Sequence, residues 1–354
     1  MAFSAGELAN IANAALDFFV DRGDVLSQTI QSKPLLKAMD GKAKTFPGGK
    51  GDVSVAVKGA YTTSVAGYTH NDTVTYANPA NIVRANYTWR EHHAGISLTH
   101  TELKHDGISV VDTDGAEVSQ HSKRDMTMLA NLLEDKLEDM MEGYARGMNT
   151  LLWGDGTSDA KAIAGIRAFV TDDPTTGTVG GINRATSGNE YWRNRAKIGA
   201  GKIAASADLV ETIHTEMRQL RRYGGRPNIA LCGSTFLDRL VKELRDKGNY
   251  TESGFSKGAD ISIGEISYNG IKFQYDPTLD DLGTSGSGAT IVDYPKRCYI
   301  LDTNHIHLMY MDGEKMKRHS PTRPANQYVM YRAITTTAVV SANMLNCNGV
   351  YQVE

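Results

Sequence analysis

The sequence lacks the features that mark secreted, disulfide-stabilised or membrane-spanning proteins. Its 354 residues include only three cysteines, Cys232, Cys298 and Cys347, which are widely spaced and form no metal-ligand pattern. We therefore expect synthesis in a reducing compartment. The first residues carry no positive cluster of a secretory signal, and no run approaches the ~20 apolar residues of a membrane span. Neither a disulfide scaffold nor a bilayer-spanning chain is expected.

The charges are nearly balanced, with 38 Lys and Arg against 41 Asp and Glu and a net charge of −3. A dedicated nucleic-acid-binding protein is normally basic, so this balance argues against that class. It does not exclude a protein that encloses nucleic acid without gripping it. Hydrophobic residues make up 40% of the chain, which is enough for one large domain or two moderate ones.

Complete catalytic motifs are missing. Gly199–Lys202 looks like half of a phosphate-binding loop, but Ile203 stands where such a loop needs Ser or Thr. His305 and His307 share one face of a predicted strand, and a solvated strand face is favoured over a metal site because no third ligand is near. A basic cluster fits a capped helix end better than a phosphate site: Arg218, Arg221, Arg222 and Arg226. We predict no catalytic residue, metal or cofactor, and a soluble enzyme with a dispersed site remains an alternative.

The dominant element is a predicted helix over residues 122–152. Apolar residues recur three or four apart along one face, and acidic residues fill the other: Met126, Leu129, Leu133, Leu137, Met140, Tyr144, Met148 and Leu151 form the apolar face. At ~1.5 Å per residue the rod is about 45 Å long, more than a small compact core can cover. Gly143 and Gly147 interrupt it, which indicates either close approach of another backbone or a bend point.

A period of two replaces the helical period after Gly48. Val53, Val55 and Val57 alternate with small or polar residues, and a second alternating run follows a crossing rich in Gly, Thr and Asn: Val83, Ala85, Tyr87 and Trp89. This pattern predicts a long hairpin whose outer end is residues 61–79. Because an isolated hairpin is only marginally stable in water, it must lie on another surface, either its own body or an adjacent copy.

The remaining elements indicate an α+β chain with an inserted segment. Helices are predicted at residues 209–220 and after Ser234, a buried strand at 229–232, and a hairpin at 266–275 around Asn269-Gly270. A short strand is expected at Ile96 and Leu98. The last part of the chain is mainly strand, including a β-branched run at 334–340. Strands on both sides of the helical segment suggest a discontinuous domain with residues 203–295 inserted into it.

The order of these parts resembles the major capsid proteins of tailed bacteriophages, which share the Hong Kong 97-like fold. The most telling short motifs are Gly-Ile-Asn-Arg at 181–184 and Tyr-Trp-Arg-Asn at 191–194. The resemblance implies the following parts: an N-terminal arm at 1–45, an extended hairpin loop at 46–100, a peripheral domain at 101–202 and 296–354 with its spine helix at 122–152, and an axial domain at 203–295.

By this resemblance, the chain is a structural protein that self-assembles through pentamers and hexamers into the icosahedral shell around a phage's double-stranded DNA genome. An encapsulin-like nanocompartment shell is the alternative. The implied partners are many copies of itself, a separate scaffolding protein, a portal protein and a decoration protein, with no membrane and no sequence-specific DNA binding. The implied location is the virion, after assembly in the host bacterial cytoplasm.

Subunit-interface residues are expected in the arm, the hairpin and the Gly/Ser loop of the axial domain. They are Leu8, Ile11, Phe19, Val53, Val55, Val57, Tyr61, Tyr76, Arg84, Arg90, Asp281 and Ser285. Gly143 and Gly147 are expected to let the spine helix flex when a rounded precursor shell expands.

Overall fold

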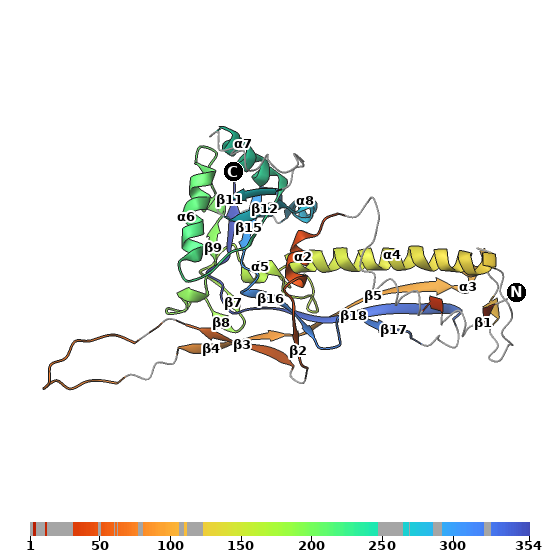
Figure 1. The fold of residues 1–354 in the computed structure, drawn as a ribbon, viewed down its shortest axis with the longest axis horizontal. Helices are drawn as coiled ribbons and strands as arrows, with labels where there is room; N and C mark the ends of the chain where they lie inside the picture. Colours follow the sequence, from red (N-terminus) through yellow and green to blue (C-terminus); the bar gives the residue numbers. More distant parts are fainter. Residues whose placement is uncertain are drawn as a thin grey trace.

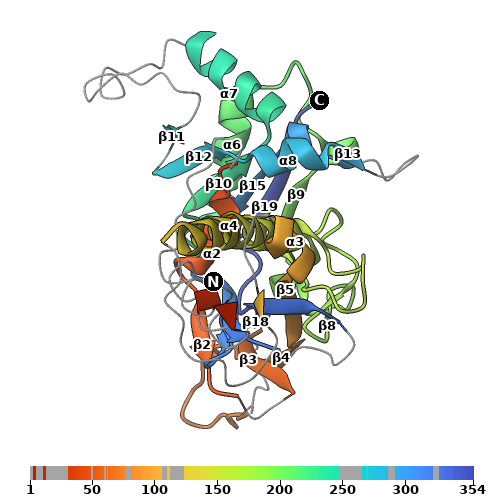
Figure 2. The same ribbon diagram turned by 90° about the vertical axis from the view of Figure 1, so that its right-hand side faces the viewer.

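A single long helix divides the molecule into an upper and a lower layer (Figures 1 and 2). The computed structural model describes residues 3–4, 11–12, 31–48, 51–59, 61, 63–76, 81–105, 110–111, 123–246, 265–268, 270–285, 292–321 and 327–354. The helix, α4, spans Lys123–Trp153 and confirms the predicted spine. It ends at Gly154, whose backbone N–H donates to the Leu151 carbonyl.

The upper layer is a six-stranded sheet with helices α6, α7 and α8 around it (Figure 2). Its strands, in spatial order, are β11 (Glu265–Tyr268), β12 (Ile271–Tyr275), β10 (Ile229–Cys232), β15 (Arg297–Leu301), β19 (Gly349–Gln352) and β9 (Arg195–Lys197). The helices are α6 (Leu209–Arg221), α7 (Ser234–Asp246) and α8 (Pro277–Leu282). Three of the six strands come from inside the expected axial domain and three from outside it, and the division at residues 203 and 295 stays a prediction.

The lower layer is a five-stranded sheet that runs beneath α4 (Figure 1). Its strands are β17 (Lys317–His319), β18 (Val329–Ala342), β16 (Ile306–Met311), β2 (Lys44–Phe46) and β5 (Arg90–Thr99). The strand expected at Ile96 and Leu98 is much longer than predicted, because β5 pairs with β18 over ten residues, from Thr99 opposite Val329 to Arg90 opposite Ala338. The residues of β5 lie within 46–100, the range expected for the extended loop.

The spine helix is anchored differently at its middle and at its end. In the middle, Leu137 and Met140 pack on Ile334 of β18, and the Tyr144 hydroxyl donates to Thr336 Oγ1 at 2.7 Å. At the end, the buried Trp153 indole donates to Asp276 Oδ2 at 3.0 Å and stacks edge-on against Tyr299. Satisfied buried polar groups of this kind hold an element in one position, because an orphaned donor is costly.

The remaining short helices and strands lie around these two layers. They are β1 (Phe3–Ser4), α2 (Pro34–Asp40), α3 (His100–His105), β6 (Val110–Val111), α5 (Ile166–Phe169), β7 (Thr178–Val179), β8 (Ile182–Asn183), β13 (Thr284–Ser285) and β14 (Val292–Asp293). β1 pairs in parallel with β6, so this piece of the expected arm contacts its own chain. α2 begins with Pro34, whose fixed φ suits the first helical turn.

Candidate subunit interface

The hairpin predicted from the alternating pattern is present and projects from the lower layer (Figure 1). Strands β3 (Asp52–Lys58) and β4 (Ile82–Thr88) are antiparallel, with Val53 opposite Tyr87 and Val55 opposite Ala85. Strand side chains alternate between faces, so these four residues share one face. Val53, Ala85 and Tyr87 are buried against the chain's own core, whereas Arg84 on the other face is exposed.

Tyr87 attaches the hairpin to the rest of the subunit. Its hydroxyl donates to the Ala342 carbonyl of β18 at 2.9 Å, and its ring lies 5.7 Å from the ring of Phe169. Burial is the main cause that raises the pKa of Tyr87, so the hydroxyl stays protonated and remains a donor at neutral pH. The base of the hairpin is therefore held by a hydrogen bond as well as by apolar packing.

Gly180 makes the closest approach to the hairpin. Its carbonyl accepts a hydrogen bond from the Asn86 N–H at 3.0 Å, which ties the outer edge of β4 to the body. A Cβ at this position would lie 2.8 Å from the Ala85 Cβ and 3.0 Å from the Tyr87 hydroxyl oxygen, and the backbone has a φ of +59°. Only glycine combines this left-handed backbone with so short a contact.

The two motifs that carried the family resemblance build the support beneath Gly180. The Arg184 guanidinium is fully buried and donates to Thr171 Oγ1 at 2.6 Å and to the Phe169 carbonyl. The buried Trp192 indole donates to the Val179 carbonyl at 3.0 Å. Burial lowers the pKa of Arg184 to about 10, because its hydrogen-bond partners Thr171, Asn194 and Phe169 are neutral groups that do not offset the loss of water. These residues position the backbone of the loop.

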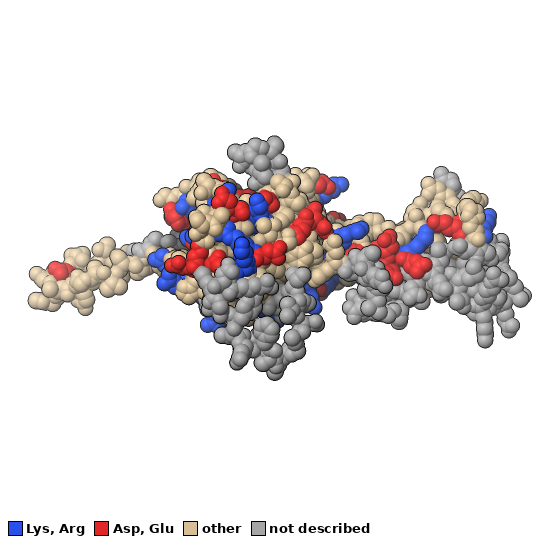
Figure 3. All heavy atoms as spheres, turned by 90° about the horizontal axis from the view of Figure 1, so that it is seen from above, with Lys and Arg blue, Asp and Glu red and all other residues tan. Residues whose placement is uncertain are grey.

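The outer end of the hairpin is uncovered. Residues 61 and 63–76 extend away from the body without regular secondary structure (Figure 1), and five large apolar side chains in them are at least half exposed: Tyr61 79%, Val65 102%, Tyr68 73%, Val74 50% and Tyr76 93%. Within 63–76 the only Lys, Arg, Asp or Glu is Asp72, so the projection is almost free of charged atoms in Figure 3. Apolar groups gathered on one projecting segment mark a contact surface.

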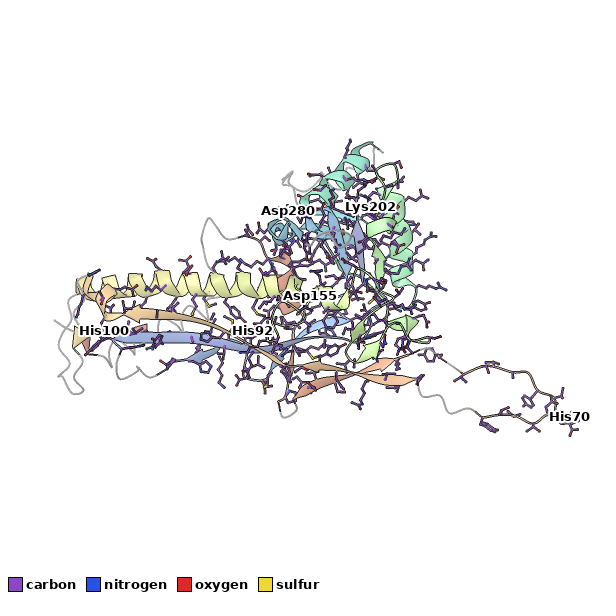
Figure 4. All side chains as sticks on the ribbon, turned by 180° about the vertical axis from the view of Figure 1, so that it is seen from behind. His70, His92, His100, Asp155, Lys202 and Asp280 are labelled. Carbon is purple, nitrogen blue, oxygen red and sulfur yellow. The ribbon has the colours of Figure 1, made fainter. Side chains whose placement is uncertain are left out.

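A tight turn shapes the tip of this segment. The Asp72 N–H donates to the Thr69 carbonyl at 2.9 Å, and the Asp72 carboxylate accepts from the Thr69 N–H at 2.8 Å and from its hydroxyl at 2.9 Å. The backbone and hydroxyl hydrogen bonds from Thr69 lower the pKa of Asp72. His70 lies within the turn, at the far end of the molecule (Figure 4). These hydrogen bonds between Thr69 and Asp72 give the tip a defined local structure.

A groove of about 850 Å³ lies where β5 leaves the hairpin and meets β17 and β18. It is lined mostly by polar residues, among them Arg90, His92, His93 and His319, with Trp89 at one side. The Trp89 indole nitrogen is buried and has no hydrogen-bond partner among the residues that the structure describes. Burial lowers the pKa of His92, which lies beneath α4 in Figure 4.

The predicted interface residues fall into three groups. Val53 and Val57 are buried inside the subunit and Val55 is half-buried, so these three attach the hairpin to its own body. Tyr61, Tyr76 and Arg84 are exposed on the hairpin, Arg90 lines the groove, and Asp281 is exposed on α8. Ile11 is half-buried, whereas Leu8, Phe19 and the side chain of Ser285 lie outside the described residues. The sequence analysis did not select Val65, Tyr68 and Val74, although the near absence of charged residues around them is a signal typical of a contact surface.

The two spine glycines line a small groove between α4 and β5. A Cβ at Gly143 or Gly147 would meet nothing within 4 Å, so no other segment among the described parts of the chain packs closely on them. The groove measures about 350 Å³ and is bordered by Met140, Met148 and residues 92–96. Alanine would fit at both positions, so packing within the described chain does not require glycine.

The two histidines considered as metal ligands have separate partners. His305 bonds to Asn343 Oδ1 at 2.8 Å. His307 is buried, and its Nε2 lies 3.0 Å from Lys44 Nζ of β2. The expected solvated strand face is therefore wrong for His307, because β2 pairs alongside β16. Among the residues that the structure describes, no group of three His, Cys, Asp or Glu side chains is placed to hold a metal, and no helix is long and apolar enough to cross a membrane.

The arrangement of long helix, projecting hairpin and two sheets defines the Hong Kong 97-like fold of phage capsid proteins, and comparison with solved structures confirms the resemblance at the level of the fold. No family model and no curated protein sequence matches the chain. The likeness to solved structures is nevertheless extensive, since it covers more than nine-tenths of the chain.

Three solved structures show this likeness. The capsid of cyanophage A-1(L) matches with a TM-score of 0.62 at 13% identity, over 93% of this chain and 95% of that one. The capsid of cyanophage P-SCSP1u matches with a TM-score of 0.54 at 10% identity, over 94% and 91%. The SrpI encapsulin of Synechococcus elongatus matches with a TM-score of 0.50 at 8% identity, over 94% and 91%. The fold is thus common to cyanophage capsids and to an encapsulin.

Replacing Gly180 by alanine should destabilise the subunit more than the same change at Gly181. Both residues have a positive φ, which costs an L-residue about 1–2 kcal/mol. A Cβ at Gly181 meets nothing within 4 Å, whereas one at Gly180 strikes the hairpin, which adds about 1–3 kcal/mol of overpacking. Urea unfolding of unassembled Gly180→Ala and Gly181→Ala subunits measures the difference. Equal losses would show that the hairpin does not rest on Gly180.

Proposed function

We propose that this chain is the major capsid protein of a tailed phage, a structural protein whose copies form pentamers and hexamers of an icosahedral shell around double-stranded DNA. The observation that carries the proposal is the uncovered outer end of the hairpin, residues 61 and 63–76, on a chain with a capsid fold. A lone subunit leaves these side chains in water. A neighbouring copy that covers them gains about 1.5–3 kcal/mol for each large apolar side chain fully buried.

Assembly then follows from repeated contacts between identical subunits. Interfaces of permanent assemblies bury about 2,000–5,000 Å², and closed symmetry lets each copy use the same surface again. Tyr61 and Tyr76 at the outer end, with Arg84 and Arg90 nearer the body, are the hairpin residues proposed to contact a neighbour. Asp281 and Ser285 are proposed to face other copies around the capsomer axis.

The charge distribution fits a container for DNA. Lys, Arg, Asp and Glu are interspersed over the upper face of the body (Figure 3), and the chain as a whole carries −3. A surface without a strongly basic field lets packaged DNA lie in the shell without adhering tightly to it. A scaffolding protein, a portal protein and a decoration protein are the further partners proposed, with assembly in the host bacterial cytoplasm and the virion as the final location.

Replacing Tyr61, Tyr68 and Tyr76 together by serine should prevent shell closure without unfolding the subunit. These rings are mostly exposed, so the thermal midpoint should stay within about 2 °C of the parent. The yield of closed shells should fall at least about tenfold, because each lost contact weakens assembly by more than 1.4 kcal/mol. Sedimentation and negative-stain electron microscopy measure the yield. Tyr223→Ser, an exposed tyrosine at the end of α6, is the control, and normal shells from the triple variant would refute the role of the loop.

The contents of purified shells distinguish the phage capsid from the second candidate, a nanocompartment that encloses protein cargo. The likeness to an encapsulin supports this candidate, although it is weaker than the likeness to the cyanophage A-1(L) capsid. Particles purified from the native source should contain long double-stranded DNA by nuclease-protection assay. A single co-purified enzyme in place of DNA, detected by mass spectrometry, would favour the nanocompartment.

Gly143 and Gly147 are proposed as a flexible point of the spine helix. Alanine at both positions should stabilise α4 by about 1 kcal/mol per site, because the added methyl groups meet open space. The double variant should therefore unfold at a higher temperature and expand from precursor to mature shell more slowly, as followed by time-resolved light scattering. Ala145→Gly, on the same helical turn, should change both quantities in the opposite direction. Unchanged expansion kinetics in the double variant would contradict a bend at these glycines.

A further inference from the structure

Two of the three cysteines lie side by side in the core of the upper layer. Cys232 ends β10 and Cys298 lies in β15, and the two residues are directly opposite each other in the antiparallel ladder. Both side chains are fully buried, and their sulfurs are 3.2 Å apart. They belong to the cluster that packs the sheet against α6 and α7, together with residues such as Phe236 and Met217. The sequence alone did not indicate this pair, because the two cysteines are far apart in the chain.

The position of the pair within the ladder suits a cross-strand disulfide. The Gly233 N–H donates to the Arg297 carbonyl at 3.0 Å, which makes the adjacent pair a hydrogen-bonded one. Hydrogen-bonded and non-hydrogen-bonded pairs alternate along an antiparallel ladder, so Cys232 and Cys298 form a non-hydrogen-bonded pair. The Cα atoms of such pairs are about 4.5 Å apart, and disulfides accept about 4.4–6.8 Å. The backbone therefore needs no rearrangement for the bond to form.

The third cysteine is separate from this pair. Cys347 lies in the turn before β19, where its thiol is 3.7 Å from the Met344 carbonyl oxygen and 3.3 Å from the Asn348 amide nitrogen. Its Cβ sits against Gly225, at a place where a second Cβ would be only 2.2 Å away. Cys347 thus packs closely against the backbone at Gly225. It serves as an internal control for any reaction of the pair.

We propose that Cys232 and Cys298 are an oxidation site, at which a small-molecule disulfide such as oxidised glutathione converts the dithiol into a disulfide that staples the upper sheet. One cysteine sulfur attacks the glutathione disulfide, forms a mixed disulfide and releases one glutathione. The other sulfur then attacks the protein-bound sulfur and releases the second glutathione. Two protein thiols and one glutathione disulfide become one protein disulfide and two glutathione thiols, and the two cysteine protons pass to the departing sulfurs.

Burial controls when this reaction takes place. Burial, the largest cause, and then the neighbouring Cys232 raise the pKa of the Cys298 thiol, so the reactive thiolate is scarce in the closed structure. The pair therefore stays reduced during synthesis in a reducing compartment and reacts slowly, through local opening, once the surroundings become oxidising. This behaviour follows from the geometry of the pair and does not depend on the proposed capsid role.

The bond would close a large covalent loop at the base of the upper layer. Cys232 and Cys298 are 66 positions apart in the sequence, and the segment between them carries α7, β11, β12, α8, β13 and β14. Crosslinking the ends of so long a segment restricts the unfolded chain strongly. The oxidised protein should therefore be more stable than the reduced one, with β10 and β15 held together covalently.

Oxidation of the full-length protein tests the proposal. The protein is incubated with oxidised glutathione, both in its native state and during refolding from urea, so that access to the thiols is assured. A non-reducing digest should then contain one peptide pair joined through Cys232 and Cys298, as identified by mass spectrometry. The thermal midpoint should rise by about 5 °C and return to its original value after treatment with dithiothreitol.

Single alanine variants distinguish a disulfide between Cys232 and Cys298 from oxidation elsewhere in the protein. Cys232→Ala and Cys298→Ala should show no oxidation-dependent rise in the thermal midpoint, whereas Cys347→Ala should keep the full rise. Free thiols at Cys232 and Cys298 after both treatments would overturn the proposal. A bridge to Cys347, or a rise that persists in Cys298→Ala, would overturn it as well.

Discussion

The length of α4 is the constraint on which the rest of the subunit depends. A helix of 31 residues extends about 46 Å, and among the described side chains its middle and its end pack into different core clusters. Its end is fixed in the central core, where Trp153 bonds to Asp276, and Asn149 bonds to both the Leu36 N–H and the Thr278 hydroxyl. Its middle rests on a different sheet. The upper body and the far ends of β5 and β18 are therefore held apart, and the molecule is elongated (Figure 1).

Two buried arginines order the loop between α4 and β9, and burial and charge act on them in different ways. Arg184 donates to backbone carbonyl and side-chain oxygens, and burial lowers its pKa. Burial acts to lower the pKa of Arg297, but its bidentate pair with Asp172, at 2.7 and 2.9 Å, and the neighbouring Tyr299 together raise it. Both hold the loop between α4 and β9, which carries Gly180. The direction of the hairpin therefore depends on polar contacts well inside the subunit.

The hairpin combines two kinds of surface in one element. Near its base, Val53 and Tyr87 are buried, so the element is anchored before any partner arrives. At its outer end, Tyr61 and Tyr76 remain in water. The hairpin is thus anchored on its own subunit and still exposes apolar side chains at its outer end. The residues that anchor the hairpin therefore differ from those proposed to contact a neighbouring copy.

Local periodicity accounts for what the sequence alone determined. The helical period of 122–152, the alternation of 52–58 with 82–88 and the pattern of the hairpin at 266–275 each depend on neighbouring residues, and α4 and the strand pairs β3–β4 and β11–β12 are present. The strand β5 was underestimated because Glu91, His92 and His93 hide its pattern, and only β18, more than 200 positions away, completes it. The need for glycine at position 180, the burial of Arg184 and the contact between Cys232 and Cys298 were decided by tertiary structure alone. They arise where distant segments meet, and a sequence pattern carries no information about which distant surfaces will pack together.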